Sequence, residues 1–179
     1  MKYFLAVVPP IELAMQIELF RAQWGQPTLP AHITVKAPNS LSDENLWLPA
    51  VQSFCQDATP IAVQLDGIGH FSSTVVYWRV ESAGLVALHQ SLLAIINPPE
   101  PERIAYFEGS AYVPHLTLAH LSNGTTTTTL STVYEQATQH WLHPVDFIAQ
   151  TLRVFRSSGP NQTYEMYMDL PLSGKSSSF

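Results

Sequence analysis

The sequence has few of the residue types that build disulfide frameworks, zinc sites or basic surfaces for nucleic acid. Cys55 is the single cysteine among 179 residues, so an internal disulfide cannot form and we expect a buried structural thiol. The chain has 8 Lys and Arg against 14 Asp and Glu, a formal net charge of −6. Because binding to long nucleic acids normally uses several cationic contacts, this balance argues against long RNA or DNA as the ligand.

Long apolar runs are also missing. No window approaches the roughly 18 uninterrupted apolar residues of a membrane-spanning helix. The apolar N-terminal stretch ends at Pro9-Pro10 and is too short for a signal peptide. We therefore expect a soluble, cytoplasmic protein that has no membrane contact and exists as a monomer.

The hydrophobic periodicity predicts an α+β protein with two similar lobes, because the order of strands and helices half-repeats along the chain. Strands are expected at residues 2–8, 31–37, 61–66, 74–80, 115–121, 145–156 and 163–169, and helices at 11–23, after Ser42, at 84–96 and at 130–141. Residues 1–172 are expected to form a single bilobal domain, and the Ser-rich residues 173–179 a disordered tail.

Local signals predict where these elements are interrupted. Ser42 is a good helix N-cap, and Pro49 is expected to break or restart the helix that follows it. Gly67 and Gly69 mark a bend between two strands. The low-complexity run Thr125–Thr129 predicts a flexible loop.

Two segments repeat the same short pattern, 83 residues apart. One reads His32-Ile-Thr34 and the other His115-Leu-Thr117, each inside an apolar stretch typical of a strand. Residues i and i+2 of a strand face the same way, so each segment presents one imidazole and one hydroxyl together. If the two lobes face each other, a cleft holds two imidazoles and two hydroxyls.

This set of side chains suits the cleavage of a phosphodiester. A neutral imidazole can take a proton from water while a protonated one gives a proton to the leaving alkoxide, because the histidine pKa lies near 6.5. Hydroxyls of Thr34 and Thr117 can donate to the non-bridging phosphate oxygens. The chemistry requires no metal and no cofactor. A zinc site is not expected, because regular alternation puts His115 and His120 on opposite strand faces and no acidic residue lies close in sequence to either motif.

The two motifs resemble those of the 2H phosphoesterase superfamily, and within it the branch of bacterial 2′-5′ RNA ligase-like proteins and cyclic phosphodiesterases. The resemblance covers about residues 1–170 and includes the segments FLAVVPP, HITVKAP, DGIGHF, VPHLTLAH and LRVFRSSG. It implies a bilobal fold with two antiparallel sheets facing a central cleft and helices outside. It also implies hydrolysis of a small cyclic phosphodiester such as a 2′,3′-cyclic nucleotide, with His32 and His115 catalytic and Thr34 and Thr117 binding phosphate.

Residue 120 departs from this pattern, because RNA ligase-like relatives often have arginine where this chain has His120. The change removes a permanent charge that would aid RNA binding, and a small cyclic phosphate is therefore the better expectation. Two other functions remain open. The chain can be a 2′-5′ RNA ligase or RNA-end processing enzyme, or a non-catalytic module that binds a nucleotide.

Four further residues are candidates for substrate binding. Lys36 is expected on the same strand face as His32, where it either contacts phosphate or lies solvated at the cleft rim. Arg156 is a second possible anion contact, with a structural salt bridge as the alternative. Tyr112 and Phe71 can stack on a base or simply pack at the rim.

Overall fold

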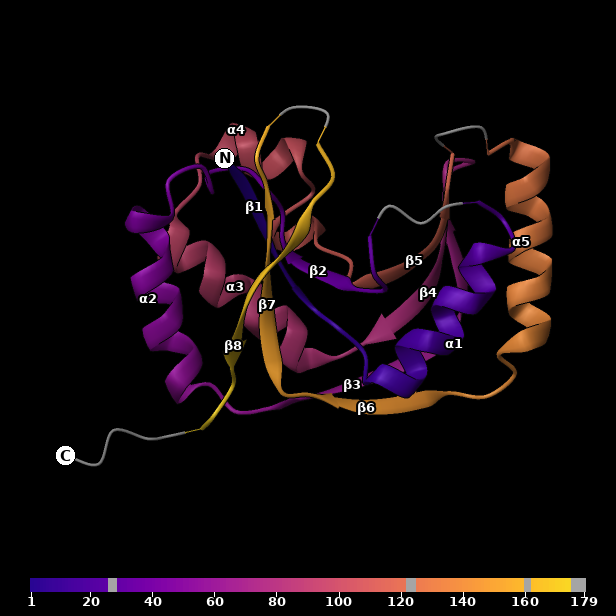
Figure 1. Cartoon of the computed structure of the whole chain (residues 1–179), viewed down its shortest axis with the longest axis horizontal. Coiled ribbons are helices and arrows are strands. Elements are labelled where there is room, and N and C mark those ends of the chain that lie inside the picture. Colours follow the sequence, from indigo (N-terminus) through magenta and orange to yellow (C-terminus); the bar gives the residue numbers. More distant parts are fainter. Residues whose placement is uncertain (26–28, 122–124, 160–161, 175–179) are drawn as a thin grey trace.

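The computed structural model describes residues 1–25, 29–121, 125–159 and 162–174 (Figure 1). In these ranges the strands are β1 (Lys2–Val7), β2 (Ile33–Lys36), β3 (Ile61–Phe71), β4 (Val75–Glu81), β5 (His115–His120), β6 (Val145–Ala149), β7 (Thr151–Ser157) and β8 (Glu165–Pro171). The helices are α1 (Ile11–Ala22), α2 (Glu44–Asp57), α3 (Ala83–Ile96), α4 (Glu100–Ala105) and α5 (Thr127–His140), with a 3-10 turn at Gly109–Ala111.

All eight strands belong to one curled antiparallel sheet, in the order β6-β3-β4-β5-β2-β1-β7-β8. The two motif strands, β2 and β5, are its central pair, and they are joined where Ile33 lies opposite Leu116. The predicted α+β class is confirmed. The two sheets expected from the sequence are the two four-stranded halves of this single sheet.

One hydrophobic core covers one face of the sheet, here named the core face. Helices α1, α2, α3 and α5 all bury apolar side chains in it. Ile33 and Leu116, the middle residues of the two motifs, have no exposed surface. Burial of an aliphatic side chain of this size stabilises the fold by about 1.5–3 kcal/mol. The opposite face, which carries the histidines and threonines of the motifs, is named the motif face.

The start of α5 differs from the expectation for the threonine run. The predicted loop over Thr125–Thr129 is wrong, because Thr127–Thr129 form the first turn of the helix. The side chain of Thr126 caps it by accepting a hydrogen bond from the Thr129 amide at 3.1 Å. Burial of Leu130 in the core then outweighs the modest helix propensity of threonine.

Helix α2 also differs, because it runs without interruption through Pro49. The predicted break is wrong. Trp47, Val51 and Cys55 recur every four residues and are all buried, so tertiary packing stabilises the helix despite the missing Pro49 amide. The N-cap is Asp43, not Ser42. Burial also raises the pKa of the Cys55 thiol to about 11, which keeps it unreactive.

The connections also contain structure that the sequence did not predict. Gly67, with φ of +70°, lies at an irregularity in the pairing of β3 with β4, and β3 continues through it as one long strand. The short helix α4 and the 3-10 turn were not expected. At the C-terminus, Ser173 and Gly174 are hydrogen-bonded to the end of α2, whereas residues 175–179 of the expected tail lie outside the described ranges.

Candidate active site

The register of β2 and β5 brings the two motifs together. Since Ile33 pairs with Leu116, antiparallel geometry puts His32 opposite Thr117 and Thr34 opposite His115. These four side chains then share the motif face. Side chains directly opposite one another have Cβ atoms about 4.5–5.5 Å apart, and diagonal neighbours such as the two histidines lie roughly 7–8 Å apart. The predicted quartet therefore occupies one small area of the sheet.

The two imidazoles are held in the same way. His32 Nδ1 lies 2.7 Å from the carbonyl oxygen of Pro30, and His115 Nδ1 lies 2.8 Å from that of Val113. A carbonyl oxygen only accepts hydrogen bonds, so Nδ1 must carry the proton in both rings. In the neutral ring Nε2 then has its lone pair free. Neither Nε2 atom has a partner among the described residues, and both are available for proton transfer.

Both histidines have pKa values below the ordinary value. Burial lowers the pKa of His115, and the hydrogen bond to the Val113 carbonyl opposes this only in part. Burial also lowers the pKa of His32, to which the positive charges of Arg21 and His115 add. The influence of His115 on His32 indicates that the two rings are close enough to interact electrostatically.

These pKa values lead to a prediction for the pH dependence of any reaction that uses one histidine as acid and the other as base. A lowered pKa means that the proton is lost at lower pH. The singly protonated pair is most abundant between two apparent pKa values that both lie below about 6.5. We expect a bell-shaped profile of kcat/KM with its maximum on the acid side of pH 6.5, falling about tenfold per pH unit above it. Initial rates with a 2′,3′-cyclic nucleotide between about pH 4.5 and 8.5 test this, and a maximum above pH 7 would contradict it.

Aromatic rings fix the positions of both histidines. The ring of His115 lies edge-on to Phe71 at 4.9 Å and to Tyr77 at 5.4 Å. Tyr77 itself lies so close to Gly69 that a Cβ there would be 2.6 Å from the ring, so a side chain at position 69 would displace it. On the other half of the sheet, His32 packs against Phe4 and Phe155, which are buried and stacked on each other at 4.6 Å.

His120 lies on the motif face, contrary to the expectation from regular alternation. Along β5 the register changes from Thr117 opposite Tyr77 to Ala119 opposite Val76, so two residues of β5 advance against one of β4. This bulge reverses the alternation beyond it. His120 pairs with Val75, which is two residues from Tyr77 and shares its face. The exposed imidazole of His120 is therefore on the same side of the sheet as Thr117.

A bulge also changes the position of Lys36. Thr34 pairs with Ala6, but the next pair joins Lys36 to Leu5, which belongs to the core. Lys36 is therefore turned to the core face and has no exposed surface. Its ammonium lies 2.9 Å from Glu108 Oε1 and donates to oxygen atoms of Ala37 and Asn39. All its protons are used inside the protein, so we do not include Lys36 among the phosphate contacts, and the solvated position at the rim is wrong.

Tyr112 and His89 hold the part of β2 that has no partner strand. The Tyr112 hydroxyl donates to the Thr34 carbonyl at 2.8 Å, and His89 Nδ1 lies 2.7 Å from the Val35 carbonyl. The two rings stack at 3.9 Å. The Gly109 amide donates to His89 Nε2, so the imidazole is neutral with its proton on Nδ1. These contacts satisfy carbonyls that would otherwise bond a neighbouring strand and hold Thr34 in place.

Arg156 lies apart from the paired histidines. It pairs with Tyr3, whose ring packs in the core, whereas the adjacent Phe155 contacts His32 on the motif face. Its guanidinium donates to Glu165 at 2.9 Å and covers the ring of Tyr167 at 4.4 Å. The structure therefore favours the structural salt bridge over the anion contact.

Two functional candidates were missed at the level of sequence. Arg79 pairs with His115, is exposed, and forms no ion pair with the described residues. Alternation in the segment 74–80 places Tyr77 and Arg79 opposite to the buried Trp78, so this face assignment was available from the sequence. Phe107, which follows α4, had no such signal.

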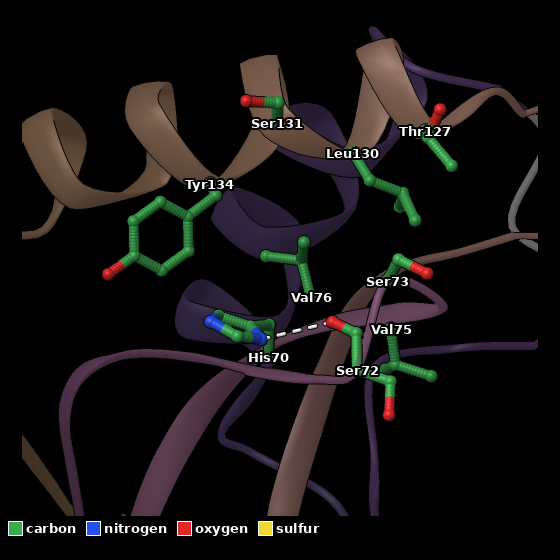
Figure 2. Close-up of a pocket in the computed structure, with 9 residues that line it drawn as sticks. All are labelled: His70, Ser72, Ser73, Val75, Val76, Thr127, Leu130, Ser131 and Tyr134. Carbon is green, nitrogen blue, oxygen red and sulfur yellow. Dashed lines mark hydrogen bonds between the residues drawn. The ribbon is translucent and has the colours of Figure 1, made fainter.

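The two motifs border one cavity and not another. A cavity of about 620 Å³ is lined by Thr34 and His115 together with Phe71 and Tyr112. A second cavity, of about 360 Å³, lies beside α5 (Figure 2). Its lining is His70, Ser72, Ser73, Val75, Val76, Thr127, Leu130, Ser131 and Tyr134. Because neither motif contributes to the second cavity, we assign the reaction to the first.

Within the described ranges, no cluster of three or more His, Cys, Asp or Glu side chains is arranged to hold a metal ion. In the same part of the chain no helix has the length and apolarity needed to cross a membrane.

A curled antiparallel sheet whose two central strands each present a histidine and a threonine defines the two-histidine class of phosphoesterase fold. The sequence matches the 2′-5′ RNA ligase superfamily over residues 9–161. The chain belongs to this superfamily, as the motif resemblance indicated. No curated protein matches the sequence significantly.

Solved structures support the same fold. TT0787 of Thermus thermophilus has 18% identity and a TM-score of 0.66, with 98% of this chain and 100% of that chain covered. E. coli LigT complexed with 3′-AMP has 19% identity and a TM-score of 0.59, with 96% and 98% covered. E. coli LigT complexed with ATP has 20% identity and a TM-score of 0.57, with 96% of this chain and 98% of that chain covered. At these identities the likeness shows the fold alone.

Proposed function

We propose that this protein is a metal-independent phosphodiesterase that hydrolyses a small cyclic phosphodiester, such as a 2′,3′-cyclic nucleotide. The observation that carries the proposal is the equivalent arrangement of His32 and His115. Each ring donates Nδ1–H to the carbonyl two residues earlier, which leaves Nε2 free. Binding alone needs no such pair, whereas general acid–base catalysis needs a proton acceptor and a proton donor on either side of one phosphorus atom.

In the proposed reaction, Nε2 of one histidine removes a proton from water as its oxygen attacks phosphorus. Nε2 of the other, protonated, histidine gives its proton to the ribose oxygen that leaves, and the ring opens to a phosphate monoester. The two histidines have then exchanged protonation states, and solvent restores them. Hydroxyls of Thr34 and Thr117 donate to the non-bridging oxygens, where negative charge increases in the transition state.

The lowered pKa values give the substrate a role in forming the proton donor. In the free protein near neutral pH both imidazoles are largely neutral, because burial disfavours the charged form. A bound phosphodiester carries one negative charge, which stabilises an adjacent imidazolium. Substrate binding and protonation of one histidine are therefore coupled.

The charge distribution favours a small substrate. The net charge of −6 and the ion pairs formed by Lys36 and Arg156 leave few cations for a long phosphate backbone. At position 120 an imidazole replaces the permanent charge of an arginine. Crystals of E. coli LigT in complex with 3′-AMP, ATP and NADP+ show that a protein of the same fold binds nucleotides.

Hydrolysis assays in EDTA test the proposal. The substrates are 2′,3′-cyclic mononucleotides, a 2′-5′ dinucleotide and ADP-ribose cyclic phosphate, with products separated by chromatography. We expect hydrolysis of the cyclic mononucleotides at a rate that EDTA does not change. Activity that disappears in EDTA would point to a metal. Tight binding without turnover would favour the non-catalytic module, and joining of 2′-5′ ends with strong salt dependence would favour the RNA ligase.

Removing one motif hydroxyl should slow the reaction without unfolding the protein. Thr34→Val keeps the shape of the side chain and removes the donor to phosphate. Because single transition-state donors contribute about 10²–10³-fold, we expect kcat to fall within or somewhat below that range. Thr34→Ser, which restores the hydroxyl, should recover most of the activity. Equal activity in Thr34→Val and wild type would remove Thr34 from the proposed site.

A further inference from the structure

The cavity beside His115 extends well beyond the space that a phosphate group needs. Its volume of about 620 Å³ is in the range of pockets that enclose small-molecule ligands. Thr34 and His115 form one part of its wall. Phe71, Tyr106 and Phe107 form another, and the exposed lining is mostly apolar. A phosphodiester held between the motifs therefore has an apolar space beside it for the rest of the substrate.

Phe107 is held in this wall in an unfavourable way. Its side chain is 73% exposed, and its φ of +54° is in the left-handed region that bulky residues rarely adopt. The neighbouring residues keep it there. Its amide donates to the Ile104 carbonyl, and the carboxylate of Glu108 is buried in the ion pair with Lys36. An exposed aromatic ring on strained backbone contributes nothing to the core and is typical of a ligand site.

Phe71 and Tyr112 are rigid parts of the same wall. Phe71 stacks on Tyr77 at 4.3 Å and meets His115 edge-on at 4.9 Å, so its place relative to the proposed catalytic group is set. Tyr112 is held by its stack on His89 and by its hydrogen bond to the Thr34 carbonyl. A planar group bound here would lose little entropy to side-chain ordering.

The cavity offers no charge to a second phosphate group. Among the residues that line it, Glu108 is the one with a permanently ionised side chain, and its carboxylate is paired with Lys36. The other polar atoms come from hydroxyls such as those of Ser72 and Thr74 and from the imidazoles. Stacking on aromatic faces tolerates every base, because each base has a π-face.

We propose that this cavity is a nucleobase subsite in which the base stacks on Phe107 while the cyclic phosphate lies between the two motifs. The inference rests on the proposed phosphodiesterase function and narrows it. The preferred substrate is a nucleoside 2′,3′-cyclic monophosphate with any base and without a further phosphate group.

A comparison of four substrates tests the subsite. These are adenosine and uridine 2′,3′-cyclic phosphate, the 5′-phosphorylated form of the adenosine compound, and methyl ribofuranoside 2′,3′-cyclic phosphate, which lacks a base. Stacking of one base corresponds to a preference in kcat/KM of roughly 5–140-fold for the nucleosides over the methyl riboside. We expect adenosine and uridine to differ by less than about tenfold, and the 5′-phosphate to bring no gain.

Variants at position 107 separate stacking from a structural effect. Phe107→Ala should reduce the ratio of kcat/KM between nucleoside and methyl riboside at least about fivefold, and Phe107→Trp should preserve it. Ile104→Ala is the matched control, because Ile104 is an exposed apolar residue of α4 that does not line the cavity. We expect this control to behave as wild type.

The outcomes distinguish the subsite from the reaction. Equal hydrolysis of nucleoside and methyl riboside would overturn the base subsite and leave the phosphodiesterase intact. A Phe107→Ala effect of equal size on both substrates would also overturn it, as would a tenfold gain from the 5′-phosphate. If no compound is hydrolysed, the proposed reaction fails, and the subsite is then judged from the ratio of Kd values measured by calorimetry.

Discussion

Replacing either His32 or His115 with alanine is expected to lower kcat for a 2′,3′-cyclic nucleotide by about 10²–10⁴-fold, the usual contribution of a general acid or base. KM should change much less, because the threonine hydroxyls and the aromatic wall remain. Since both imidazoles act in one step, the double variant should be little worse than either single variant. Rates measured at saturating substrate, in EDTA, provide the comparison.

The matched control is His143→Ala. His143 is exposed in the connection between α5 and β6, outside both motifs. Its replacement should leave kcat within about twofold of wild type, as for most surface positions. Full turnover in either motif variant, with folding confirmed by circular dichroism, would eliminate the paired-histidine mechanism. A loss only in His115→Ala would leave His32 as a residue that orients the substrate.

The second large effect is expected from Lys36→Met, which leaves the Glu108 carboxylate buried without its cation. Breaking a buried ion pair in this way typically costs about 3–5 kcal/mol of the free energy of unfolding. Stabilities of natural domains are about 5–15 kcal/mol, so the loss is a large fraction of the total. Urea unfolding should show a lower midpoint at an unchanged m-value.

A second substitution distinguishes the lost cation from lost packing. Glu108→Gln in the Lys36→Met background removes the uncompensated charge and keeps an oxygen acceptor for the Ala37 amide, which donates to Glu108 at 3.2 Å. The double variant should recover part of the stability. If Lys36 bound substrate instead, Lys36→Met would raise KM and leave the urea midpoint unchanged.

The part of the site that could be predicted from the sequence is the part with regular strand geometry. In each motif the aliphatic residue, Ile33 or Leu116, is fully buried, so the histidine and threonine beside it must turn to the other face. Alternation is a local rule that needs no knowledge of neighbouring strands. It therefore predicted the quartet, although the sequence had no means of showing that β2 and β5 are adjacent.

Alternation failed at Lys36 and at His120 for the same physical reason. Each residue lies just beyond a bulge, at the register shift opposite Leu5 and Ala6 in one case and at Ala119 in the other. One extra residue reverses every later side-chain direction. A bulge depends on pairing with the neighbouring strand, and no residue type in either segment announces it. The segment around Phe107 was missed because a six-residue helix is too short for a periodic pattern.

The position of β1 has a consequence for the order in which the protein can be assembled. Strand β1 pairs with β2 on one side and with β7 on the other, so strands near opposite ends of the chain lie side by side at Lys2 and Ser157. During synthesis one edge of β1 therefore stays unpaired until β7 has emerged, and unpaired strand edges favour aggregation. A chain truncated before β7 contains all four motif residues, yet we expect it to accumulate as insoluble material instead of retaining partial activity.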